Sequence, residues 1–86
     1  MVIRDYAFAQ CTSLKKINIP ETVKAIERNA FEGCSSLMSI TIPKSVRNIE
    51  EHVFQGCPSE FVIYGHLGSY AETYANENHI CFEAIN

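Results

Sequence analysis

The stretch that decides the fold is Cys34-Ser35-Ser36-Leu37-Met38-Ser39-Ile40-Thr41-Ile42-Pro43, in the middle of the chain. Its two isoleucines, Ile40 and Ile42, are separated by one residue. Side chains two positions apart in a strand point to the same side, so both isoleucines face one way and Thr41 faces the other. Pro43 ends the strand, because proline has no N–H to contribute to a ladder. The stretch therefore predicts a short strand with one apolar side.

The same pattern recurs along the chain with a period of 23 residues. The positions that superimpose include Ile3, Ile26 and Ile49; Phe8, Phe31 and Phe54; Cys11, Cys34 and Cys57; Leu14 and Leu37; Ile17, Ile40 and Ile63; Ile19 and Ile42; Val23 and Val46. A unit this short cannot bury its own apolar side, so successive units must stack on one another. The repetition predicts a solenoid with a parallel sheet on one side.

Each strand is followed by a polar turn and then by a second apolar pair, such as Val23 and Ile26. The next segment, 27–31, places its apolar residues at a spacing that suits one short helical turn. Gly33 and Gly56 stand where such a turn would stop, a place where glycine is favoured. Each coil is therefore expected to contain a strand, a turn, a short extended piece and a helical turn.

The repeating unit resembles the BspA-type leucine-rich repeat over roughly residues 2–64. The residues that carry the resemblance are Cys34-Ser35-Ser36-Leu37, Ile40-Thr41-Ile42-Pro43, Ser45-Val46, Ile49 and Val53-Phe54. The resemblance implies an α/β repeat fold, a leucine-rich-repeat solenoid with parallel strands and short helical turns. It also implies a non-enzymatic role in protein binding or adhesion, in cell-surface or secreted proteins of bacteria and some protists. The third copy departs from the family pattern, with Glu60 and Gly65 in place of apolar residues.

The chain divides into about two and a half repeats, residues 1–64, and a C-terminal cap of helix and strand, residues 65–86. Ser69 and Glu72 form a capping-box pattern that predicts a helix start. A helical face and a short strand follow, built from Tyr70, Ala71, Tyr74, Ala75, Ile80 and Phe82. Cys81 is expected in the core of the cap. A solenoid needs such an atypical last unit to cover its open core.

No equivalent cap precedes the first coil, so its apolar residues are expected to be only partly covered. These residues are Ile3, Ala7, Phe8, Leu14, Ile17 and Ile19. We expect the chain to be the C-terminal piece of a longer array. An edge of this kind invites pairing with another chain. A two-fold homodimer through the uncapped N-terminal coil, residues 1–15, is the simplest closed arrangement.

Composition and motifs exclude several classes of function. The 86 residues are 47% apolar and carry a net charge of −3, which argues against a nucleic-acid partner. No apolar run approaches the ~20 residues of a membrane span, and residues 1–5 do not resemble a signal peptide. The four cysteines lack zinc-site spacing, and His52, His66 and His79 have no ligand partners at such a spacing. We therefore expect free thiols, no metal, no cofactor and no catalytic residues.

The remaining candidate is the outward side of the strands, where three rows of side chains form an interaction face. Its residues are Lys15, Lys16, Asn18, Met38, Ser39, Thr41, Phe61, Val62 and Tyr64. This face contains an apolar cluster with two aromatic members, Phe61 and Tyr64. Such clusters are typical of interface cores. Coverage of Phe61 and Val62 by the cap is the alternative interpretation. The leading hypothesis is a module that binds a protein ligand. A purely structural terminator of a longer array, with binding elsewhere, is the alternative, and a small hydrolase is a third class.

Overall fold

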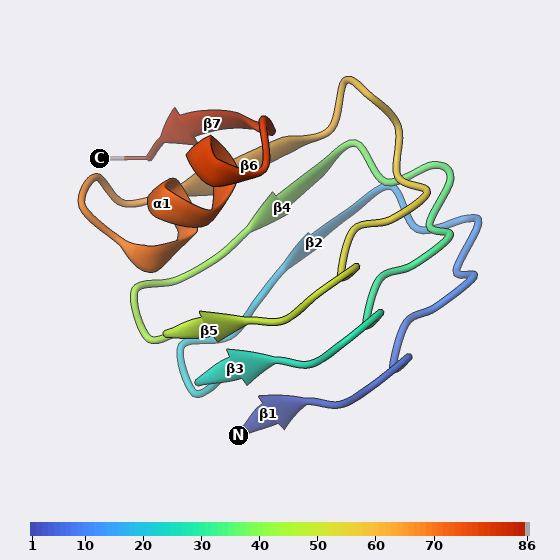
Figure 1. Ribbon diagram of the computed structural model, residues 1–86, viewed down its shortest axis with the longest axis horizontal. Helices are drawn as coiled ribbons and strands as arrows, with labels where there is room; N and C mark the ends of the chain where they lie inside the picture. Colours follow the sequence, from blue (N-terminus) through green and yellow to red (C-terminus); the bar gives the residue numbers. More distant parts are fainter. Residues whose placement is uncertain (86) are drawn as a thin grey trace.

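The coils stack so that two parallel sheets run along the solenoid in the computed structural model, which describes residues 1–85 (Figure 1). The smaller sheet has the order β1-β3-β5, and the larger has the order β2-β4-β6-β7. The strands are β1 (Val2–Ile3), β2 (Lys16–Asn18), β3 (Ala25–Ile26), β4 (Ser39–Thr41), β5 (Asn48–Ile49), β6 (Val62–Gly65) and β7 (Cys81–Ala84), and one helix, α1 (Tyr70–Glu77), precedes β7. The second sheet is a feature that the sequence interpretation did not include.

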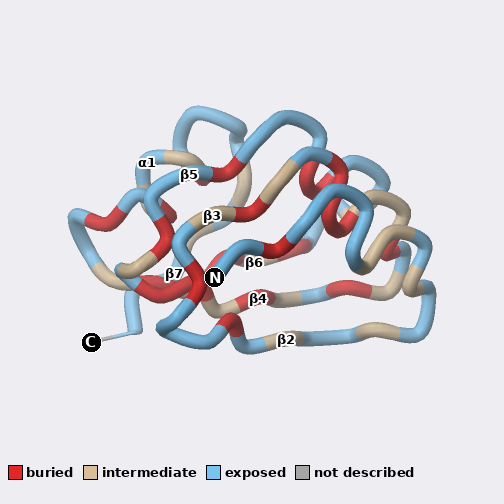
Figure 2. Tube along the Cα trace, turned by 90° about the horizontal axis from the view of Figure 1, so that it is seen from below, coloured by how far each residue is buried: buried red, intermediate tan, exposed pale blue. Residues whose placement is uncertain are grey.

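Strand register reproduces the repeat of the sequence residue by residue. Ile17 lies opposite Ile40, which lies opposite Ile63. In the smaller sheet, Ile26 lies between Ile3 and Ile49. The apolar side chains of both sheets turn inward and form one core between them, visible as the buried segments of Figure 2. The predicted solenoid with parallel, in-register strands is confirmed.

The segments expected to be helical turns form successive tight turns instead. Within the second coil, the Ala30 N–H donates to the Glu27 carbonyl and the Glu32 N–H donates to the Asn29 carbonyl. These are bonds to the third residue back, as in β-turns. Asn29 has a φ of 60° and Gly33 a φ of 74°, and such left-handed residues interrupt a right-handed helix. The predicted helical turn is therefore wrong, and Gly33 has the positive φ of a turn residue rather than ending a helix.

These turns are bonded from coil to coil by a backbone ladder of their own. The N–H groups of Asn29, Phe31 and Gly33 donate to carbonyl groups of the third coil at 3.2, 3.0 and 2.7 Å. Alternate N–H groups are therefore used between coils, while others close the turns within a coil. The chain satisfies its backbone without a helix, and each coil occupies only one strand spacing, about 4.8 Å, along the solenoid.

A column of aromatic rings follows the turns through the core. The Phe31 ring stacks on Phe8 at a centroid distance of 5.1 Å and on Phe54 at 5.7 Å. Phe54 then contacts Phe61 at 4.8 Å and Tyr74 of α1 at 6.1 Å. Phe31 is completely buried, whereas Phe8 at the start of the column is only half-buried. The column therefore ends against the helix at one side and opens to solvent at the other.

The C-terminal segment covers the last coil as the sequence predicted, by a helix and a strand. Ser69 is the N-cap of α1 and accepts a hydrogen bond from the Glu72 N–H. The Glu72 carboxylate accepts from the Gly68 N–H at 2.7 Å, one residue before the position that a capping box uses. A Cβ at Gly65 would lie 3.2 Å from the Phe82 ring and 3.3 Å from the Ala71 Cβ. Glycine thus replaces the isoleucine of the repeat because Phe82 and α1 occupy that space.

We expect Gly56→Ala to destabilise the chain more than Gly68→Ala, by at least about 1 kcal/mol in urea unfolding. Both glycines have positive φ, 85° and 78°, so both substitutions carry a similar backbone cost of about 1–2 kcal/mol. Only at Gly56 would the new Cβ meet the backbone of the neighbouring coil, 3.2 Å from Gly33. Equal losses of unfolding free energy at the two positions would show that the close approach of Gly33 to Gly56 does not limit the side chain at position 56.

Candidate functional site

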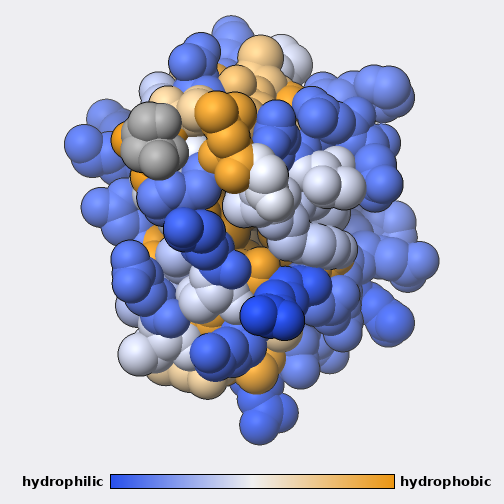
Figure 3. Space-filling model, turned by 90° about the vertical axis from the view of Figure 1, so that its left-hand side faces the viewer, coloured by the Kyte–Doolittle hydropathy of each residue, from blue (hydrophilic) through white to orange (hydrophobic). Residues whose placement is uncertain are grey.

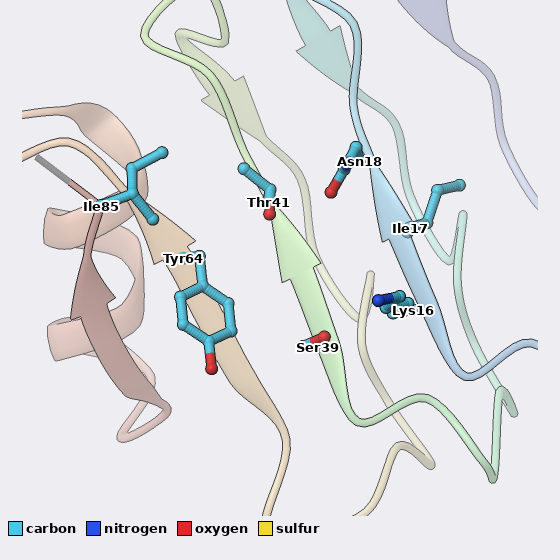
Figure 4. A pocket seen from close by; sticks show the side chains of 7 residues that line it. All are labelled: Lys16, Ile17, Asn18, Ser39, Thr41, Tyr64 and Ile85. Carbon is cyan, nitrogen blue, oxygen red and sulfur yellow. The ribbon is translucent and has the colours of Figure 1, made fainter.

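The outer side of the larger sheet carries a hollow of about 500 Å³. Figure 4 shows its seven lining side chains, which come from β2, β4, β6 and the residue that follows β7; they are Lys16, Ile17, Asn18, Ser39, Thr41, Tyr64 and Ile85. Strand register explains how residues far apart in sequence meet here. Asn18, Thr41 and Tyr64 lie opposite one another in consecutive strands. We call this surface the sheet face.

Most side chains of the sheet face have hydrogen-bonding capacity that the chain itself does not use. Within residues 1–85, the Ser39 and Thr41 hydroxyls and the Asn18 amide make no hydrogen bond to another group of the chain, and the Tyr64 hydroxyl makes none either. These donors and acceptors are held in place by a backbone that is fixed in the sheet. Such a surface can offer hydrogen bonds to a partner from side chains whose backbone positions are fixed by the sheet.

The structure brings together five of the nine residues predicted for the interaction face. Lys16, Asn18, Ser39, Thr41 and Tyr64 line the hollow. Three others do not line it. Val62 is half-buried on β6 and stands opposite Ser39, and Lys15 and Met38 are exposed just before their strands. Their role in binding stays a prediction.

The position predicted for Phe61 was wrong. Its side chain is 3% exposed and packs against Phe54 inside the core. The Leu37 N–H donates to the Cys34 carbonyl, and the Phe61 N–H donates likewise to Pro58, three residues back in both coils. The turn thus comes one residue later in the third coil, so Phe61 takes the place of Leu37 rather than of Met38. A prediction based on a strict 23-residue period cannot include this one-residue shift.

Two lining residues were not predicted. Ile17 belongs to the inward set but is half-buried, because it stands in the end strand of the sheet. Ile85 follows β7, which adds to β6 in parallel as a fourth strand. The alternation of Ile80 and Phe82 with Cys81 and Glu83 was the one sequence signal for this strand. Nothing in the sequence showed that it would extend the same sheet.

The four cysteines are free, and three of them form a column beside the aromatic rings. The Cys34 thiol donates to the Phe8 carbonyl at 3.1 Å, and the Cys57 thiol donates to the Phe31 carbonyl at 3.6 Å. Burial raises the pKa of Cys34, and it raises the pKa of Cys57 to about 11. A high pKa suppresses the nucleophilic thiolate. Cys34 and Cys57 therefore serve as packing groups, with thiols bonded to carbonyl groups of the neighbouring coil.

Cys81 does not lie in the core of the cap as predicted, because its side chain is exposed. In β7 it stands opposite Val62, whereas Phe82 stands opposite the buried Ile63. Side-chain alternation along the strand therefore points Phe82 inward and Cys81 outward.

Other kinds of site find no support among the described residues. No group of three or more His, Cys, Asp or Glu side chains within residues 1–85 could hold a metal ion. No helix in that range has the length and apolar character needed to cross a membrane. The His66 Nδ1 atom is buried and lacks a hydrogen-bond partner. Figure 3 shows that the side of the molecule near the C terminus is mostly hydrophilic, with small apolar areas between polar side chains.

A second hollow, of about 470 Å³, lies at the open end of the first coil. Its lining is mostly apolar and includes Val2, Ala7, Phe8, Ile17 and Ile19. Within the set predicted to be partly covered, Phe8, Leu14 and Ile17 are half-buried and Ala7 is exposed, while Ile3 and Ile19 are buried. We call this hollow the N-terminal hollow.

Comparison with known proteins identifies the repeat. The family model described as "BspA type Leucine rich repeat region (6 copies)" matches residues 1–82. The chain belongs to the BspA-type leucine-rich-repeat family. Among curated proteins and among solved structures, no match to this chain was found. The family assignment agrees with the solenoid of parallel strands, and leucine-rich repeats of this type form scaffolds suited to protein interaction.

We expect a coloured thiol reagent at pH 8 to modify Cys81 of this leucine-rich-repeat chain rapidly, and Cys34 and Cys57 slowly. Cys81 is exposed, whereas Cys34 is buried. With a pKa of about 11, only about one Cys57 thiol in a thousand is ionised at pH 8. Its reaction should speed up about tenfold for each pH unit between 7 and 9.

The control for this experiment is Cys81→Ser, which should abolish the fast phase and leave three of the four thiols for titration in denaturant. A second rapid thiol in that variant would show that the cysteine column is accessible. Recovery of fewer thiols in denaturant without added reductant would show a disulfide.

Proposed function

We propose that this chain is a non-enzymatic protein-interaction module whose partner binds the sheet face. The observation that carries the proposal is the hollow of about 500 Å³, whose polar side chains, Lys16 apart, project from strands in fixed register and have no hydrogen-bond partner within residues 1–85. Its lining combines hydroxyl, amide and ammonium groups with the Tyr64 ring. Tyrosine is enriched at interfaces because it joins apolar contact with a hydrogen-bonding group.

The absence of a chemical constellation in the hollow favours binding over catalysis. A hydrolytic site needs a nucleophile with an adjacent general base, or a metal with its ligands. The Ser39 and Thr41 hydroxyls share the hollow with Lys16, but no histidine, acidic side chain or thiol is among the lining residues that the structure describes. The hollow therefore contains groups that recognise a ligand and lacks a base of the usual kind to activate a nucleophile.

The wider setting of the module is part of the proposal and comes from the family. BspA-type repeats are commonly surface-associated in bacteria, so we propose that the chain acts in a cell-surface or secreted adhesion protein of a bacterium or protist. The structural terminator remains the competing function. It would require the sheet face to bind nothing and the cap to serve only to cover the last coil.

The test compares Thr41→Arg with Asn48→Arg in capture of proteins from an extract of the host or neighbouring cells. Thr41 lies in the hollow, whereas Asn48 is exposed on β5 in the opposite sheet. An arginine at position 41 should fill the hollow and weaken binding of the captured protein at least about tenfold, a loss of about 1.4 kcal/mol. The captured protein is then purified and its affinity measured by calorimetry.

Retention of full affinity by Thr41→Arg, together with a loss in Asn48→Arg, would place binding on the other sheet and contradict the proposal. If the unmodified chain captures nothing that survives purification and titration, the terminator function is supported instead.

A further inference from the structure

The turns of the third coil carry a row of backbone N–H groups without partners. In the second coil, three N–H groups of the turns donate to carbonyl groups of the third coil. The equivalent N–H groups of the third coil belong to His52, Phe54 and Gly56. None of these three donates to another group within residues 1–85. The chain itself ends the ladder of turns here, because after β6 it continues into α1 and β7.

The carbonyl groups of the same turns are already in use. Each carbonyl group from 51 to 55 accepts a backbone hydrogen bond, either from the second coil or from within the third coil. The backbone therefore offers donors at this place without an unused carbonyl group. The edge of a β-strand differs, because it presents both N–H and C=O groups. An ordinary strand laid against these turns would find no acceptor for its own N–H groups.

Two adjoining hollows lie beside this row of N–H groups. They share Phe54 and Ile80 in their lining, and their volumes are about 290 and 230 Å³. The Tyr74 ring lines the larger hollow, and Pro58 and Phe61 line the smaller one. No Asp, Glu, Lys or Arg is among the lining residues that the structure describes. The partial positive charge of the N–H row is therefore not neutralised by a side chain of either hollow. We call the two the cap hollows.

Tyr74 adds a side-chain donor to the larger cap hollow. Its hydroxyl makes no hydrogen bond to another group within residues 1–85. Burial raises the pKa of Tyr74 to about 12, so the hydroxyl keeps its proton at neutral pH and can donate it in a hydrogen bond. The donors of this region therefore come from the backbone and from an aromatic ring.

We propose that the cap hollows bind a proline-rich segment of another protein. Proline has a carbonyl acceptor and no N–H, which suits a surface that has free donors and no free carbonyl group. In the polyproline II conformation the carbonyl groups make no internal hydrogen bonds, so they can accept from the N–H row. The proline rings enter the hollows beside Phe54 and Tyr74. Aromatic-lined grooves are a recurrent binding site for such segments. This site is distinct from the one proposed on the sheet face.

Two other occupants fit the cap hollows less well. A phosphate or carboxylate group would find no lysine or arginine among the described lining residues to balance its charge. A second copy of residues 1–86 would not supply the segment either, because its three prolines, Pro20, Pro43 and Pro58, stand far apart in the sequence. The partner is therefore a different protein.

The test follows by NMR the titration of the chain with a capped eight-residue proline peptide and with a matching peptide of alternating serine and valine. We expect the proline peptide to bind at least about tenfold more tightly, because the other peptide brings N–H groups that find no acceptor. The proline peptide should shift the amide signals of His52, Phe54 and Gly56. It should also slow the exchange of these amides with solvent, because their N–H groups gain acceptors.

Ser59→Arg and Ser35→Arg form a matched pair of variants. Both serines are exposed, but only Ser59 lines a cap hollow. Each variant adds the same charge, and only the arginine at position 59 would fill the hollow. We expect Ser59→Arg to weaken binding of the proline peptide at least about tenfold and Ser35→Arg to leave it unchanged. If Ser59→Arg lowers the thermal unfolding temperature, the amide shifts of the unmodified chain decide the outcome.

Equal binding of the two peptides would overturn the selection for proline. An equal effect of the two variants, or shifts confined to the sheet face, would place binding elsewhere and contradict the proposed site. The absence of any shift at millimolar proline peptide would overturn the proposal altogether.

Discussion

Backbone hydrogen bonding between equivalent residues of successive coils is the constraint on which this structure depends. The strands of both sheets and the turns between them are bonded from coil to coil, so every coil must return to the same place after nearly the same number of residues. The core follows from this constraint. Ile17, Ile40 and Ile63 stack because their backbones are in register, and the phenylalanine rings stack for the same reason.

The same constraint produces the sheet face. Parallel strands in register place equivalent positions of the repeat side by side. Polar residues at the outward positions therefore gather on one surface, although their side chains do not bond one another. This gives the hollow lined by Asn18, Thr41 and Tyr64.

The interior of the chain has packing roles that could be mistaken for chemistry. Three cysteines in a column suggest a metal site or disulfides, but burial raises the pKa of Cys34 and Cys57 and their thiols donate to carbonyl groups of the preceding coil. The corner of each coil has room for a small side chain only and contains a backbone carbonyl group. The cysteine thiol is small and can donate a weak hydrogen bond to that carbonyl group. Their recurrence therefore reflects the geometry of the turn.

The sequence by itself determined the period, the strand positions of the larger sheet, their inward and outward sides and the helix start at Ser69, because these depend on local alternation and capping. Most of the sheet face followed, since five of its lining residues are outward positions of predicted strands. Only the tertiary structure decided the places of Phe61, Cys81 and Ile85. A one-residue slip at Pro58 moved Phe61 into the core, and addition of β7 to β6 set the side that Cys81 faces and brought Ile85 to the hollow. Slips of register and the docking of a cap are settled by packing between distant segments, which local patterns in the sequence do not express.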